Sequence, residues 1–250
     1  MSKKTVEFYH WSAACPMNID ILKLIKEYDK RLDIRIYDVS DDFGLAKIMG
    51  MFYPTLTVVN GKIRRYSPFG REFLDMICEG VVPEEKPYQP KLGTKTFEGE
   101  VVAVTRENYG TAAVCTGRRC CKGCEEKIRF FEDKGMSVFG FMNLRNGKLV
   151  GGAEYVPSVL VPYDIPHDEQ TAFLSCVYLS DEEYDYKTAA LRELEKYLTG
   201  KYGKIVVISD EKGVFPNGDM EFFVRNGYMD VSIVFEDQYC RLHLMEKELR

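Results

Sequence analysis

The sequence predicts an α/β protein composed of two units. Short runs of β-branched and aromatic residues alternate with runs whose apolar residues recur every three or four positions. A stretch rich in proline, glycine and charge, residues 80–96, interrupts both patterns and is the best candidate for a boundary. The chain has 250 residues, 45% of them hydrophobic, so each side of that boundary can fill a core.

The first unit is predicted to follow the order β-α-β-α-β-β-α. The sequence TVVNGKIRRY indicates a hairpin that turns at Asn60-Gly61, because both residues adopt positive φ readily. The other elements are strands over 5–9 and 32–39 and helices over 17–30, 43–49 and 70–79.

Two motifs in this unit resemble the thioredoxin fold over most of residues 1–80. The sequence WSAACP, residues 11–16, follows the first strand, where thioredoxins carry W-C-x-x-C. Pro54 stands where they carry a cis-proline. The resemblance implies a site formed by Ser12, Cys15 and Pro54. It departs at the attacking cysteine, which is Ser12 here.

A serine hydroxyl cannot exchange disulfides, so the dithiol cycle is excluded. Ser12 is expected to act as a helix N-cap, and Cys15 to lie in the first helical turn. Two interpretations of Cys15 stay open. It is either a packed core residue, which we favour, or a thiol that forms a mixed disulfide with a thiol partner.

The second unit begins near Phe97 and contains more strands. A hairpin is predicted to turn at Asn146-Gly147, and Gly227 is predicted to end a short helix that starts near residue 218. The remaining elements are strands over 99–105, 172–179, 204–209, 231–235 and 239–245, and helices over 125–133 and 187–198.

This order resembles the GNAT N-acetyltransferases over about residues 97–246. The sequence FFVRNGY, residues 222–228, is similar to the F-Y-x-K-x-G-F of that family, and residues 174–198 are similar to its central strand and helix. The predicted fold class is therefore α/β: a thioredoxin-like domain over 1–82, a linker over 83–96, and a GNAT-like mixed-sheet domain over 97–250.

The resemblance implies acyl-CoA-dependent transfer to the amine of a small molecule or protein. Acetyl-CoA or another acyl-CoA would be the donor. Its pantetheine arm would lie along the backbone around Cys176, Val177 and Leu179. Glu154, on the preceding strand, is the candidate general base, although a solvated or salt-bridged glutamate is the alternative. The tyrosine that supplies a proton in the family is replaced by Phe223, which we expect in the core.

The loop that holds the CoA pyrophosphate in that family reads Q/R-x-x-G-x-G/A. An ungapped alignment puts Glu182, Asp185 and Lys187 at its key positions. Side chains there obstruct the backbone and carboxylates repel phosphate, while Lys187 offsets one charge. We therefore predict weak coenzyme A binding. A compatible interpretation is that these acids complement the dipole of the helix that follows.

Half of the eight cysteines lie within ten residues, at Cys115, Cys120, Cys121 and Cys124. Four thiolates suffice for a zinc site, although adjacent cysteines are awkward ligands. A redox disulfide, a vicinal dithiol and simple burial stay open. The alternative function is therefore a thiol-based protein that binds a metal ion or a partner. A third is a non-catalytic binding module.

Net charge and hydropathy indicate which partners and which cellular location to expect for this chain. The net charge of −5 disfavours nucleic acid and anionic membranes as partners. No apolar run approaches the roughly 20 residues of a membrane span, and MSKKTVEFYH lacks a secretory signal. We therefore expect a cytoplasmic protein whose cysteines are mostly reduced.

Overall fold

The computed structural model describes residues 3–85, 91–113, 123–211, 217 and 219–250. Contacts divide these residues into two compact units. The first comprises 3–85, 123–130 and 162–164, and the second comprises the other described residues. Within the described ranges, no helix is long and apolar enough to cross a membrane.

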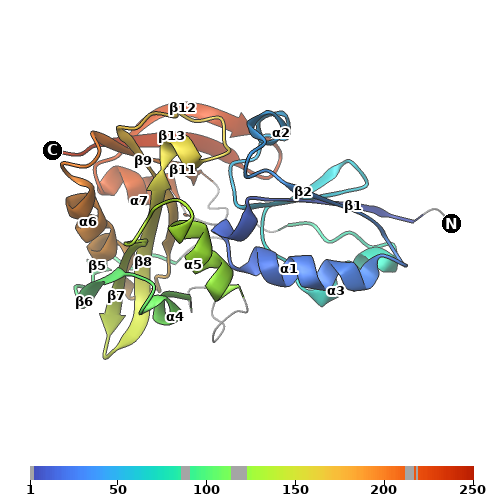
Figure 1. Ribbon diagram of the computed structural model, residues 1–250, viewed down its shortest axis with the longest axis horizontal. Helices are drawn as coiled ribbons and strands as arrows, with labels where there is room; N and C mark the ends of the chain where they lie inside the picture. Colours follow the sequence, from blue (N-terminus) through green and yellow to red (C-terminus); the bar gives the residue numbers. More distant parts are fainter. Residues whose placement is uncertain (1–2, 86–90, 114–122, 212–216, 218) are drawn as a thin grey trace. The chain divides into compact units, whose positions relative to one another are not determined.

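The first unit is built on a four-stranded sheet in the order β2-β1-β3-β4. Figure 1 labels β1 and β2 of this sheet. Strands β1 and β2 are parallel, and the other neighbours are antiparallel. The predicted order of strands and helices is observed. The elements are β1 Thr5–His10, η1 Ser12–Ala14, α1 Met17–Ile25, η2 Lys26–Tyr28, β2 Asp33–Asp38, α2 Phe43–Ile48, β3 Thr55–Val59, β4 Ile63–Arg65 and α3 Arg71–Cys78.

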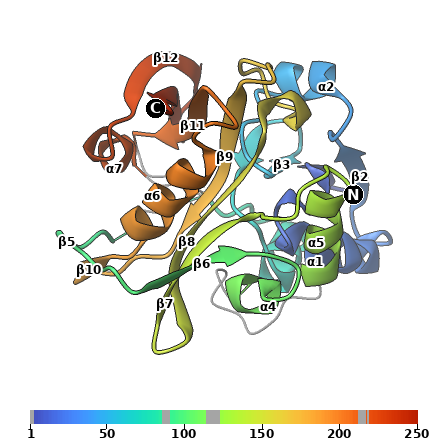
Figure 2. The same cartoon turned by 60° about the vertical axis from the view of Figure 1, so that its left-hand side comes forward.

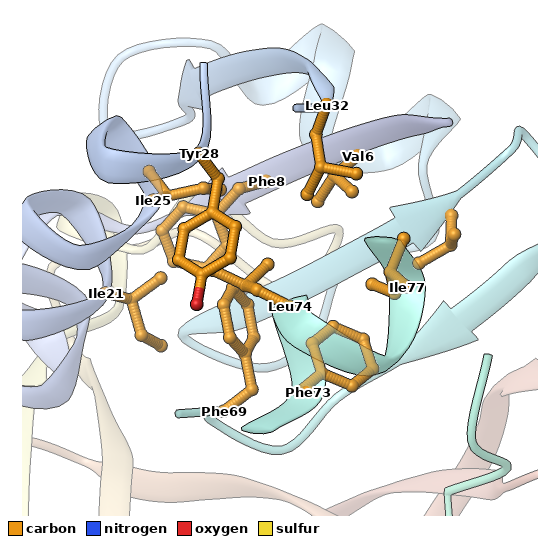
Figure 3. Packing of buried hydrophobic residues seen from close by; sticks show 11 residues of the cluster. Val6, Phe8, Ile21, Ile25, Tyr28, Leu32, Phe69, Phe73, Leu74 and Ile77 are labelled. Atoms are coloured by element: carbon orange, nitrogen blue, oxygen red, sulfur yellow. The ribbon is translucent and has the colours of Figure 1, made fainter. Parts of the chain in front are cut away.

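The core of this unit lies between the sheet and two helices (Figure 3). Val6 and Phe8 are two residues apart on β1, so they project from the same face of the sheet. Ile21 of α1 and Leu74 of α3 pack into the same cluster, and all four side chains are at most 1% exposed. Burial of each such side chain contributes about 1.5–3 kcal/mol. The two helices therefore cover one face of the sheet.

Both predicted hairpins are confirmed by their backbone geometry. Asn60 and Gly61 have φ of 52° and 65°, and Asn146 and Gly147 have φ of 53° and 70°. Paired left-handed residues match the twist of the flanking strands, which is why Asn-Gly is strongly preferred there.

The second unit is built on a seven-stranded mixed sheet in the order β12-β13-β11-β9-β8-β7-β6. Only β9 and β11 are parallel neighbours. Its strands are β6 Glu100–Val104, β7 Gly140–Arg145, β8 Lys148–Pro157, β9 Thr171–Tyr178, β11 Lys204–Asp210, β12 Met229–Glu236 and β13 Arg241–Glu248. A separate two-stranded ladder joins β5 Lys95–Thr96 and β10 Tyr184–Asp185.

Helix α6, Lys187–Leu198, lies across the sheet beside β8 and β9 (Figure 2). Leu191, Leu194 and Leu198 are fully buried, which confirms the predicted amphipathic helix with the predicted bounds. The other helices are α4 Tyr109–Ala112, α5 Cys124–Glu132, η4 Ser158–Leu160 and α7 Met220–Arg225. The mixed α/β class is confirmed. Helix α4 and the β5–β10 ladder were not predicted.

Candidate functional site

Strands β9 and β11 diverge near the middle of the second unit's sheet. They pair only over Thr171–Phe173 of β9 and Lys204–Val206 of β11. On its other side β9 stays paired with β8 as far as Tyr178. Beyond Phe173, the edge of β9 that faces β11 therefore offers its backbone groups to partners other than a strand.

A β-bulge lies where this divergence begins. Leu174 is opposite Tyr155 and Cys176 is opposite Glu154, so Ser175 is one extra residue on β9. The Ser175 hydroxyl oxygen is buried, and no described residue is its hydrogen-bond partner. Bulges often lie beside active sites, where they redirect side chains. Buried hydroxyls without a partner are rare in native proteins because they lose their hydration, so Ser175 is a candidate for a functional role.

Asn217 bridges the two diverging strands. The Val177 N–H donates to its Oδ1 at 3.1 Å, and its Nδ2 donates to the Ile208 carbonyl at 3.0 Å. The side chain is 3% exposed. One carboxamide therefore satisfies a donor on β9 and an acceptor on β11. Asn217 was not predicted, because a single asparagine in a loop carries no local signal in the sequence.

The structure brings three predicted site residues together. Glu154 and Cys176 are cross-strand partners, so their Cβ atoms lie about 5 Å apart. Val177 follows directly on β9. Glu154 is 3% exposed, so it is not solvated, and the alternative of a salt-bridged glutamate stays open. Leu179, with φ of 64°, marks the end of β9. Phe223 is fully buried, so its predicted place in the core is confirmed.

The loop between β9 and α6, residues 179–186, is called the acidic loop here. Two of its own carboxylates accept hydrogen bonds from backbone N–H groups of the loop and of the start of α6. Asp181 Oδ1 accepts from the N–H groups of Glu183 and Tyr184, at 2.9 and 2.8 Å. Asp185 Oδ1 accepts from those of Lys187 and Thr188, at 2.9 and 3.1 Å. Backbone hydrogen bonds hold the pKa of Asp181 below its ordinary value. Each aspartate thus occupies the two N–H groups that lie two and three residues ahead.

Lys187 is not presented at the surface of this loop. Its side chain is 2% exposed, and Nζ lies 4.9 Å from the centroid of the Phe222 ring. Burial lowers the pKa of Lys187, and the opposing effect of Asp219 and Asp185 is smaller. The Lys187 side chain is held inside the unit. The prediction that it offsets a phosphate charge requires it to lie at the surface of the loop.

Residues 91–97 run along the outside of the acidic loop. Strand β5 pairs with β10, and the Phe97 N–H donates to the Asp185 carbonyl at 2.9 Å. A side chain at Gly93 would collide with the backbone of Glu183 and Tyr184. Part of the predicted linker is therefore a structured segment that covers the loop. The pairing of β5 with β10 joins residues far apart in the chain, so sequence patterns do not reveal it.

The thioredoxin-like motif of the first unit is held together by Asn18. Its Nδ2 donates to the Ser12 and Pro54 carbonyls, at 2.8 and 3.0 Å, and the Trp11 N–H also donates to Pro54. Ser12 and Pro54 are thus brought together as predicted.

The predicted roles of Ser12 and Cys15 in a helix are wrong. Ser12 has φ of 38° within the short turn η1 and does not cap α1, which starts at Met17. Cys15 precedes that helix. The reason is Pro16, whose fixed φ of −62° suits the start of a helix and displaces the start past Cys15.

The motif is also buried by residues from later in the chain. The Trp11 ring contacts those of Phe130 and Tyr163 edge to face, with 5.3 Å between centroids in each pair. Lys127 Nζ donates to the Ala14 carbonyl. Trp11 is 1% exposed and Cys15 6%. A partner thiol therefore cannot reach Cys15 without local opening, which sequence analysis did not predict.

Beside this motif, His10 is 5% exposed and stacks on Phe8. Burial lowers the pKa of His10, with a smaller opposing effect of Asp38. The neutral imidazole is favoured, and no described residue is a hydrogen-bond partner of its Nδ1.

The predicted metal site cannot be assembled from the described residues. Cys124 is buried at the start of α5, and Cys115, Cys120 and Cys121 lie outside the described residues. In the part of the chain that the structure describes, no group of three or more histidine, cysteine, aspartate or glutamate side chains is arranged to hold a metal ion.

We expect no catalytic reduction of insulin disulfides by the purified chain. Ser12 cannot attack a disulfide, and Cys15 is buried. The insulin precipitation assay should give the rate of the reductant alone, with or without Cys15→Ser. A wild-type rate above that background, lost in Cys15→Ser, would show that one thiol suffices.

No family model matches the chain, and no curated protein sequence matches it. Solved structures similar to this chain include the aminoglycoside 6'-N-acetyltransferase from Enterococcus faecium, at 12% identity and a TM-score of 0.44, covering 60% of this chain and 97% of that one. The ribosomal-protein-alanine N-acetyltransferase from Brucella melitensis has 16% identity and a TM-score of 0.43, covering 60% and 99%. An N-acetyltransferase from Staphylococcus aureus Mu50 has 14% identity and a TM-score of 0.44, covering 62% of this chain and 100% of that one. TM-scores below 0.5 at these identities assign the chain to no family.

Proposed function

We propose that the second unit is a GNAT-type N-acyltransferase, which moves an acyl group from a pantetheine thioester such as acyl-CoA to an amine of a small molecule or protein. The observation that carries this proposal is the divergence of β9 and β11, bridged by the Asn217 carboxamide. The order of strands and helices, which agrees with the order that the sequence resemblance implies, supports it.

The diverging strands suit the amide groups of a pantetheine arm. An amide offers one N–H and one C=O, and these match the Ile208 carbonyl and the Val177 N–H. Asn217 already fills this position with the same functional group. A donor arm entering between the strands takes over one or both of these hydrogen bonds and displaces the Asn217 side chain.

The reaction needs a base for the amine proton, and Glu154 is our candidate. It lies at the bulge beside Ser175, and it is buried.

In the proposed step the amine nitrogen attacks the thioester carbonyl. The C–N bond forms, Glu154 accepts the amine proton, and the C–S bond breaks as the thiolate leaves. The thiolate takes its proton from water, because Phe223 has none to give. The Ser175 hydroxyl, which lacks a partner among the described residues, donates a hydrogen bond to the developing oxyanion.

The acidic loop does not fit the diphosphate of coenzyme A. Asp181 and Asp185 hold the N–H groups that a diphosphate would need, and no step of the proposed reaction passes through the loop. The metal-binding alternative depends on Cys115, Cys120 and Cys121, which lie outside the described residues, so it gains no support.

Incubation of the purified chain with millimolar acetyl-CoA and a mixed set of amines tests the proposal. The set should contain polyamines, aminoglycosides and peptides with free N-termini. Mass spectrometry should find an acetylated amine together with an equal amount of free coenzyme A. If no amine in the set is acetylated and coenzyme A release does not depend on amine, the proposal is wrong.

A further inference from the structure

We infer that the acyl donor of this unit is recognised through its pantetheine arm alone, without contacts to a nucleotide diphosphate. The inference rests on the proposed function and narrows its substrate class: acetyl-pantetheine should serve as well as acetyl-CoA. Three features of the loop after β9 carry it.

The first feature is that the loop's N–H groups are already occupied. Two pairs of N–H groups, on Glu183 and Tyr184 and on Lys187 and Thr188, donate to two carboxylates of the same loop. The Thr188 hydroxyl donates to Asp185 as well, at 2.6 Å. A carboxylate is itself an anion, so Asp185 fills the position that a phosphate takes at other helix N-termini, and Asp181 occupies two N–H groups of the loop before the helix.

The second feature is the cover formed by residues 91–97. The β5–β10 pairing and the contact of Gly93 with the Glu183 backbone occupy the outer side of the loop. Lys91 forms an ion pair with Glu182, and its carbonyl accepts from the Ser180 hydroxyl. A diphosphate would have to displace this segment as well as the two aspartates.

The third feature is the charge of the loop. Asp181, Glu182 and Glu183 are exposed, and Asp185 is buried directly behind them. Lys187 is turned into the interior, against Phe222. Two cations also lie beside the loop: Lys91, paired with Glu182, and Arg145, over the Tyr184 ring. The four carboxylates outnumber them, so the loop keeps a negative charge, and like charges repel more strongly where water is partly excluded.

At the divergence of β9 and β11, the Asn217 side chain is a described group that bonds to both strands, and its amide can be displaced by another amide. Val177 and Ile208 offer a donor and an acceptor to an uncharged pantetheine arm. The unit would therefore bind the donor through the pantetheine arm next to the thioester, and not through the nucleotide.

A titration followed by NMR of the ¹⁵N-labelled full chain tests the inference, with pantetheine and coenzyme A as the two probes. Both should shift the Val177 amide resonance as Asn217 is displaced, and their Kd values should agree within about tenfold. A loop that held the diphosphate by two charge-assisted hydrogen bonds would favour coenzyme A by about 100-fold or more, and that result would overturn the inference. If neither probe shifts Val177, the proposed function itself fails.

Two loop variants sharpen the test. Asp181→Ala frees two N–H groups without touching α6, and it should raise the affinity for coenzyme A relative to pantetheine. Asp185→Gly provides a second measurement at the start of α6. Asp237→Ala is the matched control, because Asp237 caps the N–H groups of Tyr239 and Cys240 in the same way on another loop. An equal change of the affinity ratio in all three variants would mean that the aspartates do not block a diphosphate.

Discussion

Replacing Glu154 by glutamine is expected to slow acyl transfer by about 10²–10⁴-fold, the usual contribution of a positioned general base. Glutamine keeps the shape of the side chain and cannot accept the amine proton at neutral pH. The loss should appear in kcat, with little change in the KM for the donor, because a general base acts on the amine proton in the transition state. Steady-state kinetics with the amine found by the acceptor survey measure both constants.

Glu195→Gln is a matched control for this variant. Glu195 of α6 is also a buried carboxylate, but its Oε2 lies 2.6 Å from Nζ of Lys247 and forms an ion pair with it. Its replacement should lower stability and leave kcat unchanged. If Glu154→Gln is folded by near-ultraviolet circular dichroism and keeps kcat within about threefold, Glu154 is not the base.

Replacing Phe130 by alanine is expected to destabilise the first unit by about 3–5 kcal/mol. Phe130 is buried, and its ring packs edge to face against Trp11. Trp11 is the only tryptophan of the chain, so its fluorescence reports on this packing. The urea midpoint of the fluorescence transition should fall, and the emission of the folded variant should shift to longer wavelength as water reaches Trp11.

Ile48→Ala serves as the control, because Ile48 of α2 is 83% exposed and its loss should be almost neutral. A Phe130→Ala variant with an unchanged midpoint and unchanged emission would show that α5 does not pack on the Trp11 motif in solution.

The features that the sequence predicted well depend on local signals. Asn60-Gly61 and Asn146-Gly147 carry the backbone preference of their turns, and the leucine stripe of α6 carries its buried face. Weak phosphate binding by the loop stays a prediction, which rests on the residue types at Glu182, Asp185 and Lys187.

The features that the sequence missed depend on contacts between distant residues. Asn217 reaches Val177 forty positions away, and Lys127 reaches Ala14 from an even more distant part of the chain.

The hydrogen bonds of the two loop aspartates, in contrast, had a local signal in the sequence. Asp181 and Asp185 each accept from the N–H groups two and three positions ahead, which is a common habit of aspartate. The position of Ser12 was misjudged because Pro16 was a stronger determinant of the helix start than the capping preference of serine.

The central claim is that the acidic loop occupies its own anion site, and a calorimetric titration of the purified chain with coenzyme A tests it most directly. We predict a Kd of about 100 µM or weaker, because a diphosphate must displace two carboxylates and the segment that covers them. A Kd of about 1 µM or tighter would mean that the loop binds the diphosphate despite Asp181 and Asp185, and it would contradict this account.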